Sequence, residues 1–299
     1  MPTIEMGFNE PDVEILGNGV IRFRNALKGD WDTVYDYIDE MVKRERSAMY
    51  EPTTDPETGE PAYINRSGYL FSQESIDSMP HRGSAIHQDE RDEVHQLFDT
   101  FEDARDACLL RYFEKYPLAY NCVWWKVKGH IVAYGPGVYL GSHSDISAEY
   151  VYGIHQTRNE LALRNVVSCL IYLNDSVDSE DELNGRNFTG GDFHFDYLDV
   201  SFKPKAGDIV MFPSNYMAAH QVLPVEKGQR ISYLGWYSQG TPNPAVHEDV
   251  TDPLQQPEVA RISTNVWLPT LREDYRNFLT ERGYDKSSPQ YRVTNLNTG

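Results

Sequence analysis

Two short segments decide the fold of this 299-residue chain: Gly141-Ser-His-Ser-Asp-Ile146 and His220-Gln-Val-Leu-Pro-Val-Glu-Lys-Gly-Gln-Arg230-Ile-Ser-Tyr-Leu-Gly-Trp236. In the first segment, His143 and Asp145 stand two residues apart, and alternate residues of a strand point to the same face of a sheet. On a strand, an imidazole and a carboxylate would therefore meet at one point. Both groups are ligands of divalent transition metals, and a third ligand must then come from a distant strand.

The sequence around these segments is typical of β-structure. Beyond Asn121, short β-rich runs are separated by Gly and Pro, which is characteristic of a β-sandwich or barrel. The predicted strands are Cys122–Val127, Ile131–Tyr134, Val166–Leu173, Asp192–Phe195, Ile209–Phe212 and Ile231–Tyr237.

One strand and three helices are predicted outside this β region. Gly19–Phe23 alternates apolar and polar residues, as a half-buried strand does, and Asp30 can cap a helix that follows it. That helix carries an apolar stripe of Trp31, Val34, Tyr35, Ile38, Met41 and Val42. A second helix is predicted from about Asp89 to Tyr116, with Val94, Leu97, Phe98, Phe101, Cys108, Tyr112 and Tyr116 on one side, charges elsewhere, and Pro117 ending it. A last helix is predicted behind Pro269, with Leu271, Tyr275, Phe278 and Leu279 on its apolar side.

The pattern favours one domain over residues 1–299. We expect a helical N-terminal support at 1–120, a β core at 121–240 and a C-terminal extension at 241–299, because no repeat or sharp change of composition divides the chain.

Composition narrows the functional class. The formal net charge of -19, with no basic stripe, would repel phosphate backbones, so nucleic acid is not an expected partner. No apolar stretch reaches the length that spans a membrane, and no signal peptide is seen at Met1–Phe8. Cys108, Cys122 and Cys169 are widely spaced, odd in number and in apolar surroundings, which indicates free thiols in a reducing compartment. The expectation is a cytoplasmic protein with no membrane partner.

The second segment makes the pattern specific. A His-x-x-x-Pro-Val run begins at His220, Arg230 follows ten residues after that histidine, and the next strand ends in Trp236. In this order the chain resembles the Fe(II)/2-oxoglutarate-dependent dioxygenases, and within them the prolyl 4-hydroxylase-like branch. Further matches, in order along the chain, are Tyr134-Gly-Pro-Gly-Val-Tyr139, Val166–Asn174 ending in Ile-Tyr-Leu-Asn, Gly190-Gly191-Asp192-Phe193 and Lys203-Pro-Lys-Ala-Gly-Asp-Ile-Val-Met-Phe-Pro213. The resemblance covers roughly Tyr134–Tyr237 and, more loosely, Val20–Val42.

The resemblance implies a mainly β fold with flanking helices (α+β), whose core is a double-stranded β-helix of the jelly-roll or cupin-like kind. It implies one Fe(II) bound by His143, Asp145 and His220, with 2-oxoglutarate and O2 as co-substrates and ascorbate as a reductant. It also places Arg230 on the distal carboxylate of 2-oxoglutarate, since a guanidinium can bind both oxygens of a carboxylate. Ser232 shares the face of Arg230. Tyr134, Tyr172 and Ser232 are each either a contact of the co-substrate or a buried structural residue.

The implied reaction is hydroxylation of an unactivated C–H bond, with 2-oxoglutarate converted to succinate and CO2. The many aromatic residues and the long helical N-terminal half indicate an elaborated pocket, which favours a small molecule or an amino acid as the substrate. Related halogenases replace the carboxylate ligand by Gly or Ala, so Asp145 favours hydroxylation over halogenation. Three alternatives stay open: hydroxylation of peptidyl proline, the same chemistry ending in desaturation or cyclisation, and a cupin-like binding protein without turnover. The oligomeric state is open as well.

The remaining candidates receive ordinary structural interpretations. Trp236 is expected in the core. Either Glu51–Pro61 or Ile146–Arg164 could be a substrate lid, and either could be a plain surface loop. His194 could face the barrel or turn away from it, depending on the register of its strand. The histidines expected at the surface or behind the ligands are His81, His87, His95, His130, His155, His194 and His247.

Overall fold

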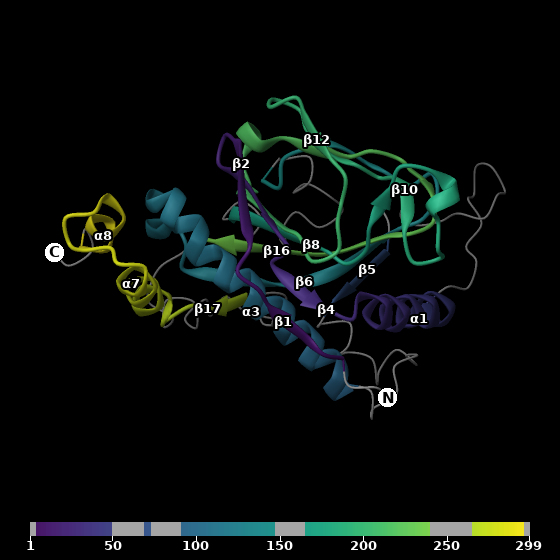
Figure 1. Ribbon diagram of the computed structural model, residues 1–299, viewed down its shortest axis with the longest axis horizontal. Helices are drawn as coiled ribbons and strands as arrows, with labels where there is room; N and C mark the ends of the chain where they lie inside the picture. Colours follow the sequence, from purple (N-terminus) through teal and green to yellow (C-terminus); the bar gives the residue numbers. More distant parts are fainter. Residues whose placement is uncertain (1–3, 50–68, 73–90, 147–164, 240–264, 296–299) are drawn as a thin grey trace, which may run out of the picture.

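The structure, a computed structural model, describes residues 4–49, 69–72, 91–146, 165–239 and 265–295. Within these ranges the chain forms two facing β-sheets with helices packed on the outer side of the larger one (Figure 1).

The larger sheet, called the major sheet here, is antiparallel throughout. Along its main path the strands are ordered β17 (Asn265–Trp267), β6 (Trp125–Tyr134), β16 (Arg230–Ser238), β8 (Asn165–Tyr172), β13 (Ile209–Pro213), β3 (Val20–Arg24) and β2 (Asp12–Gly17), and β5 (Tyr69–Ser72) also pairs with β6. β3 pairs directly with β13, so strands from before residue 120 extend the same sheet.

The smaller, minor sheet has the order β12 (Val200–Phe202), β11 (Phe193–Phe195), β14 (His220–Val222) and β7 (Leu140–His143). Two short ladders complete the strands: β15 (Val225–Lys227), β10 (Phe188–Gly190) and β9 (Ser176–Val177), and the pair β1 (Met6–Phe8) and β4 (Leu27–Gly29). From β6 to β16 the chain passes repeatedly from one sheet to the other, which is the winding of a double-stranded β-helix. The predicted fold class is confirmed.

The predicted helices are also confirmed. They are α1 (Trp31–Met49), α3 (Arg91–Lys115) and α7 (Leu271–Glu281), with a short α8 (Pro289–Arg292) and 3-10 turns η3 (Pro117–Asn121), η5 (Glu180–Glu182), η6 (Tyr216–Ala218) and η7 (Val293–Asn295). Asp30 caps α1 as expected, because its carboxylate accepts hydrogen bonds from the Thr33 amide at 3.1 Å and the Thr33 hydroxyl at 2.6 Å.

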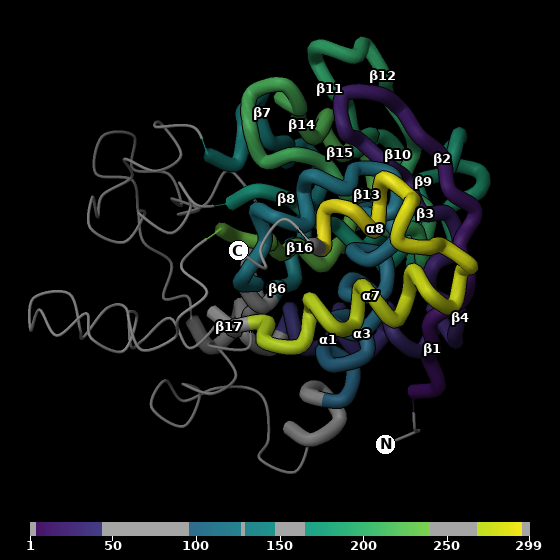
Figure 2. The backbone as a smooth tube through the Cα atoms, turned by 90° about the vertical axis from the view of Figure 1, so that its left-hand side faces the viewer, coloured from purple at the N-terminus to yellow at the C-terminus, as the bar shows by residue number. Residues whose placement is uncertain are grey.

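The major sheet separates two hydrophobic cores. Figure 2 shows α1, α3 and α7 on one side of β6, β16 and β8, and the minor strands β7, β14, β11 and β12 on the other. The core on the helix side includes Ile171, Ile209 and Tyr233. Between the two sheets lies an aromatic core, whose buried rings include Tyr172, Phe193, Phe195, Phe202 and Phe212.

One prediction about the strands is wrong. Two separate strands were expected at Cys122–Val127 and Ile131–Tyr134, whereas β6 runs unbroken through Gly129. The pairing of β6 with β16 shifts register between Leu234 and Trp236, which is a β-bulge. A Cβ atom on Gly129 would lie 2.3 Å from the Tyr233 ring, so glycine here permits close packing across the bulge and does not end the strand.

Two expectations about exposure also need correction. α3 was expected to turn its charges away from the apolar side, yet Glu102 and Arg105 are 5% and 0% exposed. Cys122 was expected in apolar surroundings and is exposed, whereas Cys108 and Cys169 are buried free thiols. Each helix in the described part of the chain is too short or too polar to cross a membrane.

Candidate active site

The floor of the candidate site is the face of the major sheet that looks towards the minor sheet. Arg230, Ser232, Leu234 and Trp236 are alternate residues of β16, so their side chains share this face. Neighbouring strands supply their cross-strand partners, in order along β16: Arg230 with Tyr134, Ser232 with Val132 and Tyr172, Leu234 with His130 and Leu170, and Trp236 with Ser168. Arg230 and Trp236 therefore mark opposite ends of the floor.

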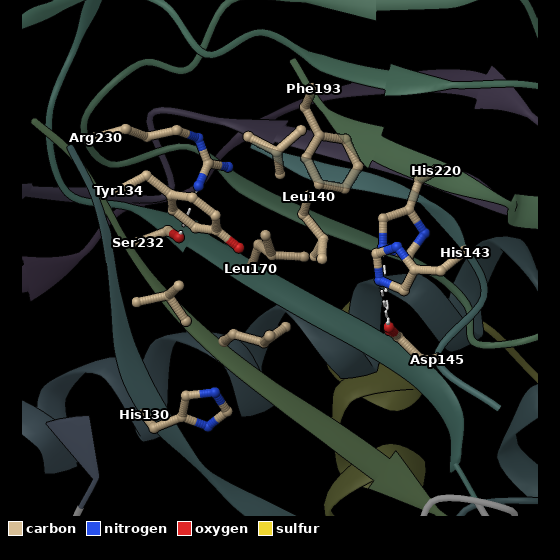
Figure 3. Close-up of a pocket in the computed structure, with 13 residues that line it drawn as sticks. His130, Tyr134, Leu140, His143, Asp145, Leu170, Phe193, His220, Arg230 and Ser232 are labelled. Atoms are coloured by element: carbon tan, nitrogen blue, oxygen red, sulfur yellow. Dashed lines mark hydrogen bonds and ion pairs between the residues drawn. The ribbon is translucent and has the colours of Figure 1, made fainter. Parts of the chain in front are cut away.

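The three predicted metal ligands meet at the Trp236 end. His143, the last residue of β7, is paired directly with His220, the first residue of β14. Asp145 follows in a turn and not on the strand, as had been expected, but its Oδ1 still lies 3.5 Å from Nε2 of His143 and 3.8 Å from Nε2 of His220. One ligand atom from each residue lies within 4.8 Å of the others (Figure 3). The group is the one cluster of this kind in the described residues.

Backbone carbonyls orient both imidazoles. Nδ1 of His143 lies 2.8 Å from the carbonyl oxygen of Gly141, and Nδ1 of His220 lies 3.0 Å from that of Ala218. When Nδ1 carries the proton and donates it to a carbonyl, Nε2 keeps its lone pair for a metal ion. Both Nε2 atoms face Asp145, so the tautomers favoured by the backbone suit a shared ion.

Asp145 is held from behind by two donors. The Ser168 hydroxyl donates to Oδ2 of Asp145, and the indole N–H of Trp236 donates to the same oxygen at 3.0 Å. Oδ1 is the atom that faces the histidines. Trp236 was expected to be a plain core residue, and this interpretation is wrong: it is partly buried and bonds a candidate ligand.

Electrostatics keep this carboxylate charged. Burial alone would raise the pKa of Asp145, but its contacts with His143, His220 and Ser168 lower it to about 2. Burial lowers the pKa of His220, which favours the neutral imidazole that binds metals. For His143, burial has the same tendency, but the hydrogen bond and charge of Asp145 raise its pKa above the ordinary value. Two imidazoles and one carboxylate form the donor set of the facial triad that binds non-haem Fe(II).

Arg230 lies at the other end of the pocket and is 1% exposed. Its Nη1 donates to the Ser232 hydroxyl at 3.2 Å, whereas Nε and Nη2 have no hydrogen-bond partner. Among the described residues no carboxylate forms an ion pair with it. A buried, unpaired guanidinium is costly, and a bound carboxylate would supply both the charge and the missing acceptors. The fork of Arg230 therefore fits an anionic co-substrate.

The other predicted contacts surround this guanidinium. The carbon Cζ of Arg230 lies 5.3 Å from the ring centroid of Tyr134 and 5.4 Å from that of Tyr172. Tyr134 and Ser232 line the pocket with Arg230 (Figure 3), and the buried hydroxyl of Tyr172 has no hydrogen-bond partner. Six of the seven predicted site residues therefore line the pocket, whereas Tyr172 lies beside Arg230 and is not part of the lining.

Several residues of the site were not predicted from the sequence. Ser168 and Trp236 meet Asp145 because β8 and β16 pair in a register that the sequence does not reveal. His130 lines the pocket, although it was expected at the surface or behind the ligands. His194 turns outward, since its neighbours Phe193 and Phe195 are 1% and 0% exposed. The two lid candidates, Glu51–Pro61 and the segment after Ile146, lie outside the described residues, as do His81, His87, His155 and His247; the side chain of His95 is likewise not described.

Comparisons with known proteins place these residues in a family. Residues 129–238 match the model of the 2OG-Fe(II) oxygenase superfamily, a stretch that contains every predicted site residue. No curated protein matches the chain in sequence.

Among solved structures, a Pseudomonas putida prolyl-4-hydroxylase is 20% identical, with a TM-score of 0.43 over 75% of this chain and 94% of that one. A Trichoplax adhaerens prolyl hydroxylase, solved with a peptide fragment of the hypoxia inducible factor oxygen degradation domain, is 15% identical, with a TM-score of 0.44 over 74% and 84%. The viral collagen prolyl hydroxylase of Paramecium Bursaria Chlorella virus-1 is 20% identical, with a TM-score of 0.35 over 49% and 75%. The β core at residues 129–238 thus matches the 2OG-Fe(II) oxygenase superfamily, and this match, together with the triad, indicates an oxygenase that uses Fe(II), 2-oxoglutarate and O2.

Proposed function

We propose that this oxygenase hydroxylates an unactivated C–H bond of a small molecule or an amino acid. In this proposal His143, Asp145 and His220 bind the iron, and Arg230 binds the distal carboxylate of 2-oxoglutarate, with Tyr134, Tyr172 and Ser232 around it. The observation that carries the proposal is the presence, in one pocket, of a metal-binding triad and a buried arginine that has no acidic partner in the described residues.

The protein's part in this reaction is binding and orientation. When bound, Fe(II) with 2-oxoglutarate supplies oxygen activation, with release of succinate and CO2. Arg230 would hold the distal carboxylate of the co-substrate at one end of the pocket, with its 2-oxoacid end directed towards the triad. The apolar residues between the two ends exclude water from the reacting groups: Val132, Leu140, Leu170, Phe193, Val222 and Leu234.

The carboxylate of Asp145 also bears on the outcome. Two donors fix its Oδ2 and leave Oδ1 towards the two histidines. In the proposed site this residue occupies a coordination position that chloride would need in a halogenase, which supports hydroxylation.

The first test is co-substrate turnover. The purified protein with Fe(II) is expected to convert 2-oxoglutarate to succinate, and His220→Ala is expected to lose this activity, because it removes a buried ligand. His194→Ala is the matched control, since His194 lies on the outer face of β11 and bonds Ser201 at 2.8 Å. Wild-type turnover by His220→Ala would refute the ligand assignment.

A second measurement separates an enzyme from a binding barrel. Anaerobic addition of Fe(II) and 2-oxoglutarate is expected to produce a visible charge-transfer band, and its absence would favour a cupin-like binding role. Free amino acids and blocked peptides can then be screened for stimulated succinate release. Stimulation by prolyl peptides alone would replace the small-molecule proposal with peptidyl-prolyl hydroxylation.

A further inference from the structure

One polar side chain in the pocket has no role in the proposed function. The triad, Arg230, Ser232 and Tyr134 are assigned to iron and 2-oxoglutarate, and six of the other lining residues are apolar. The remaining residue is His130. A predominantly apolar pocket with one isolated polar group is the usual form of a site that orients a ligand by a single hydrogen bond.

His130 projects into the pocket away from the co-substrate end. On β6 it stands four residues from Tyr134, on the same face, and it is paired with Leu234 across to β16. Because same-face residues repeat every two positions at about 3.3 Å per residue, His130 lies roughly 13 Å along the strand from the Arg230 end. Figure 3 shows the imidazole apart from both Arg230 and the triad, at a third corner of the pocket.

The imidazole is held in place, but its hydrogen-bonding capacity is not used by the described residues. Its ring centroid lies 5.5 Å from that of Trp236, the residue that bonds Asp145. No residue in the described part of the chain gives or accepts a hydrogen bond at His130. The two rings are tilted by 38°. An imidazole packed against an indole in this way, with both nitrogens available, is preorganised for a ligand.

We propose that His130 binds the substrate through a hydrogen bond to an uncharged polar group, such as an amide or a hydroxyl. This proposal rests on the proposed function and adds the chemical class of the group that the pocket accepts.

The charge state of His130 supports an uncharged partner. Burial, together with the positive charge of Arg105 on the other side of the sheet, lowers its pKa to about 4, against the opposing effect of Asp145. At neutral pH the ring is therefore neutral, with one donor and one acceptor. The lining residues near it, Leu234, Val132 and Leu170, are apolar. A charged substrate group placed there would be desolvated without a counter-ion, which is strongly unfavourable.

The test uses three small probes of nearly equal shape: isobutyramide, isobutyrate and isobutylammonium. The 299-residue protein is labelled with 13C-histidine and loaded with Zn(II) in place of iron, and with 2-oxoglutarate, so that no turnover occurs. The resonance of the His130 ring is identified by its absence in His130→Leu. Binding of each probe is followed by the shift of this resonance in the wild type, and by saturation transfer to the probe in all variants.

Isobutyramide is expected to shift the His130 resonance in a saturable way, and the two charged probes are expected to bind at least about 30-fold more weakly. His130→Leu should weaken amide binding about 3- to 10-fold, the effect of one neutral hydrogen bond. His130→Asn, which keeps a donor and an acceptor, should restore part of the affinity. His194→Leu, on the outer face of β11, should bind the amide as the wild type does.

Three outcomes would overturn the proposal: no saturable shift with the amide, equal shifts with a charged probe, or undiminished amide binding by His130→Leu. Failure of the proposed function is recognised separately. If the wild type gives no charge-transfer band with Fe(II) and 2-oxoglutarate, both proposals fall. If the band forms and the amide leaves His130 unchanged, only the role of His130 is lost.

Discussion

Two fully buried arginines lie on opposite sides of the major sheet, close to the same strand, β16. Arg105 on α3 is 0% exposed, and Arg230 at the start of β16 is 1% exposed. Desolvation of a guanidinium costs several kcal/mol wherever it occurs, so the two residues face the same physical problem. They differ in the hydrogen-bond and ion-pair partners that the protein supplies to each guanidinium.

Arg105 is surrounded by its own partners. Its Nη1 lies 3.2 Å from the Glu102 carboxylate, and Nη2 donates to the carbonyl oxygen of Trp236 at 3.1 Å. Glu102 in turn pairs with Lys126 at 3.0 Å and accepts a hydrogen bond from the Tyr233 hydroxyl at 2.7 Å. Gly235 makes room for this contact, because a Cβ atom there would lie 1.8 Å from Nη1 of Arg105.

Arg230 has one weak hydrogen-bond partner, the Ser232 hydroxyl at 3.2 Å, and no carboxylate within ion-pair distance in the described residues. Burial and charge therefore do not by themselves identify a functional arginine. A buried charge whose partners come from the fold supports the fold. One whose partners are missing indicates that a ligand completes the site.

The largest change in stability is expected when the buried charge cluster of Glu102, Arg105 and Lys126, on the helix side of the major sheet, is disrupted. Glu102→Gln keeps the shape of the side chain and removes the negative charge, so Arg105 and Lys126 lose their shared buried partner. We expect the free energy of unfolding to fall by about 3–5 kcal/mol, as measured by chemical denaturation.

The control for this variant is Asp103→Asn, one position further along the same helix. Asp103 is exposed, and its pKa is raised by burial and by neighbouring acids, so loss of its charge should change stability by less than about 0.5 kcal/mol. Equal effects of the two substitutions would contradict the structural role of Glu102.

The next largest effect is expected at Arg230, on the affinity for 2-oxoglutarate. Arg230→Met should weaken 2-oxoglutarate binding about 100- to 1,000-fold, or about 3–4 kcal/mol, because a charge-assisted fork is lost. In the absence of 2-oxoglutarate the variant should be no less stable than the wild type, since the substitution removes an unpaired buried cation. Calorimetric melting with and without the co-substrate measures both quantities. Arg230→Lys, which keeps the charge but not the fork, should bind with intermediate affinity.

The residues of the site that could be predicted from the sequence are those that stand in local motifs. His143, Asp145, His220 and Arg230 stand in short ordered motifs, and motifs of this kind survive as local patterns in the chain. Alternation along the strand correctly placed Ser232 beside Arg230. The β fold followed from the same stretches.

Other parts of the site depend on contacts between distant elements. Trp236 meets Ser168 because β16 and β8 pair in one register, and a shift of one residue would turn one of the two side chains away from Asp145. Glu102 and Arg105 lie on a helix whose charges were expected to face water, yet both are buried. Gly235 leaves space for Arg105 on the sheet, and the Gly129 amide donates a hydrogen bond to Glu102 at 2.9 Å. No local pattern encodes this complementarity.

A smaller effect is expected for His130, whose pKa is influenced by Arg105 on one side of the major sheet and by Asp145 on the other. Its pKa of about 4 in the folded protein lies below the ordinary 6.5, so the unfolded chain binds the proton more readily. Its contribution to stability is therefore complete above about pH 6.5 and is lost as the pH falls towards 4. Between pH 7 and pH 5 the wild type should lose roughly 2 kcal/mol through this group. In His130→Leu and His130→Asn, the free energy of unfolding should fall by about 2 kcal/mol less over this pH range than in the wild type. If either variant shows the pH dependence of the wild type, the lowered pKa of His130 is contradicted.

The smallest effect is expected from loss of the hydrogen bond that Ser168 donates to Asp145. Ser168 donates to Oδ2 of Asp145, so Ser168→Ala frees one side of a carboxylate that is otherwise held only by Trp236 on that oxygen. Because such supporting contacts orient metal ligands, Fe(II) affinity should fall about 10-fold, measured by anaerobic titration. Ser214→Ala is the matched control: its hydroxyl lies 2.9 Å from that of Ser168 and does not contact Asp145, so its effect should be smaller. If the two alanine variants bind Fe(II) equally well, the orientation of Asp145 does not depend on Ser168, and Trp236 alone fixes this carboxylate from behind.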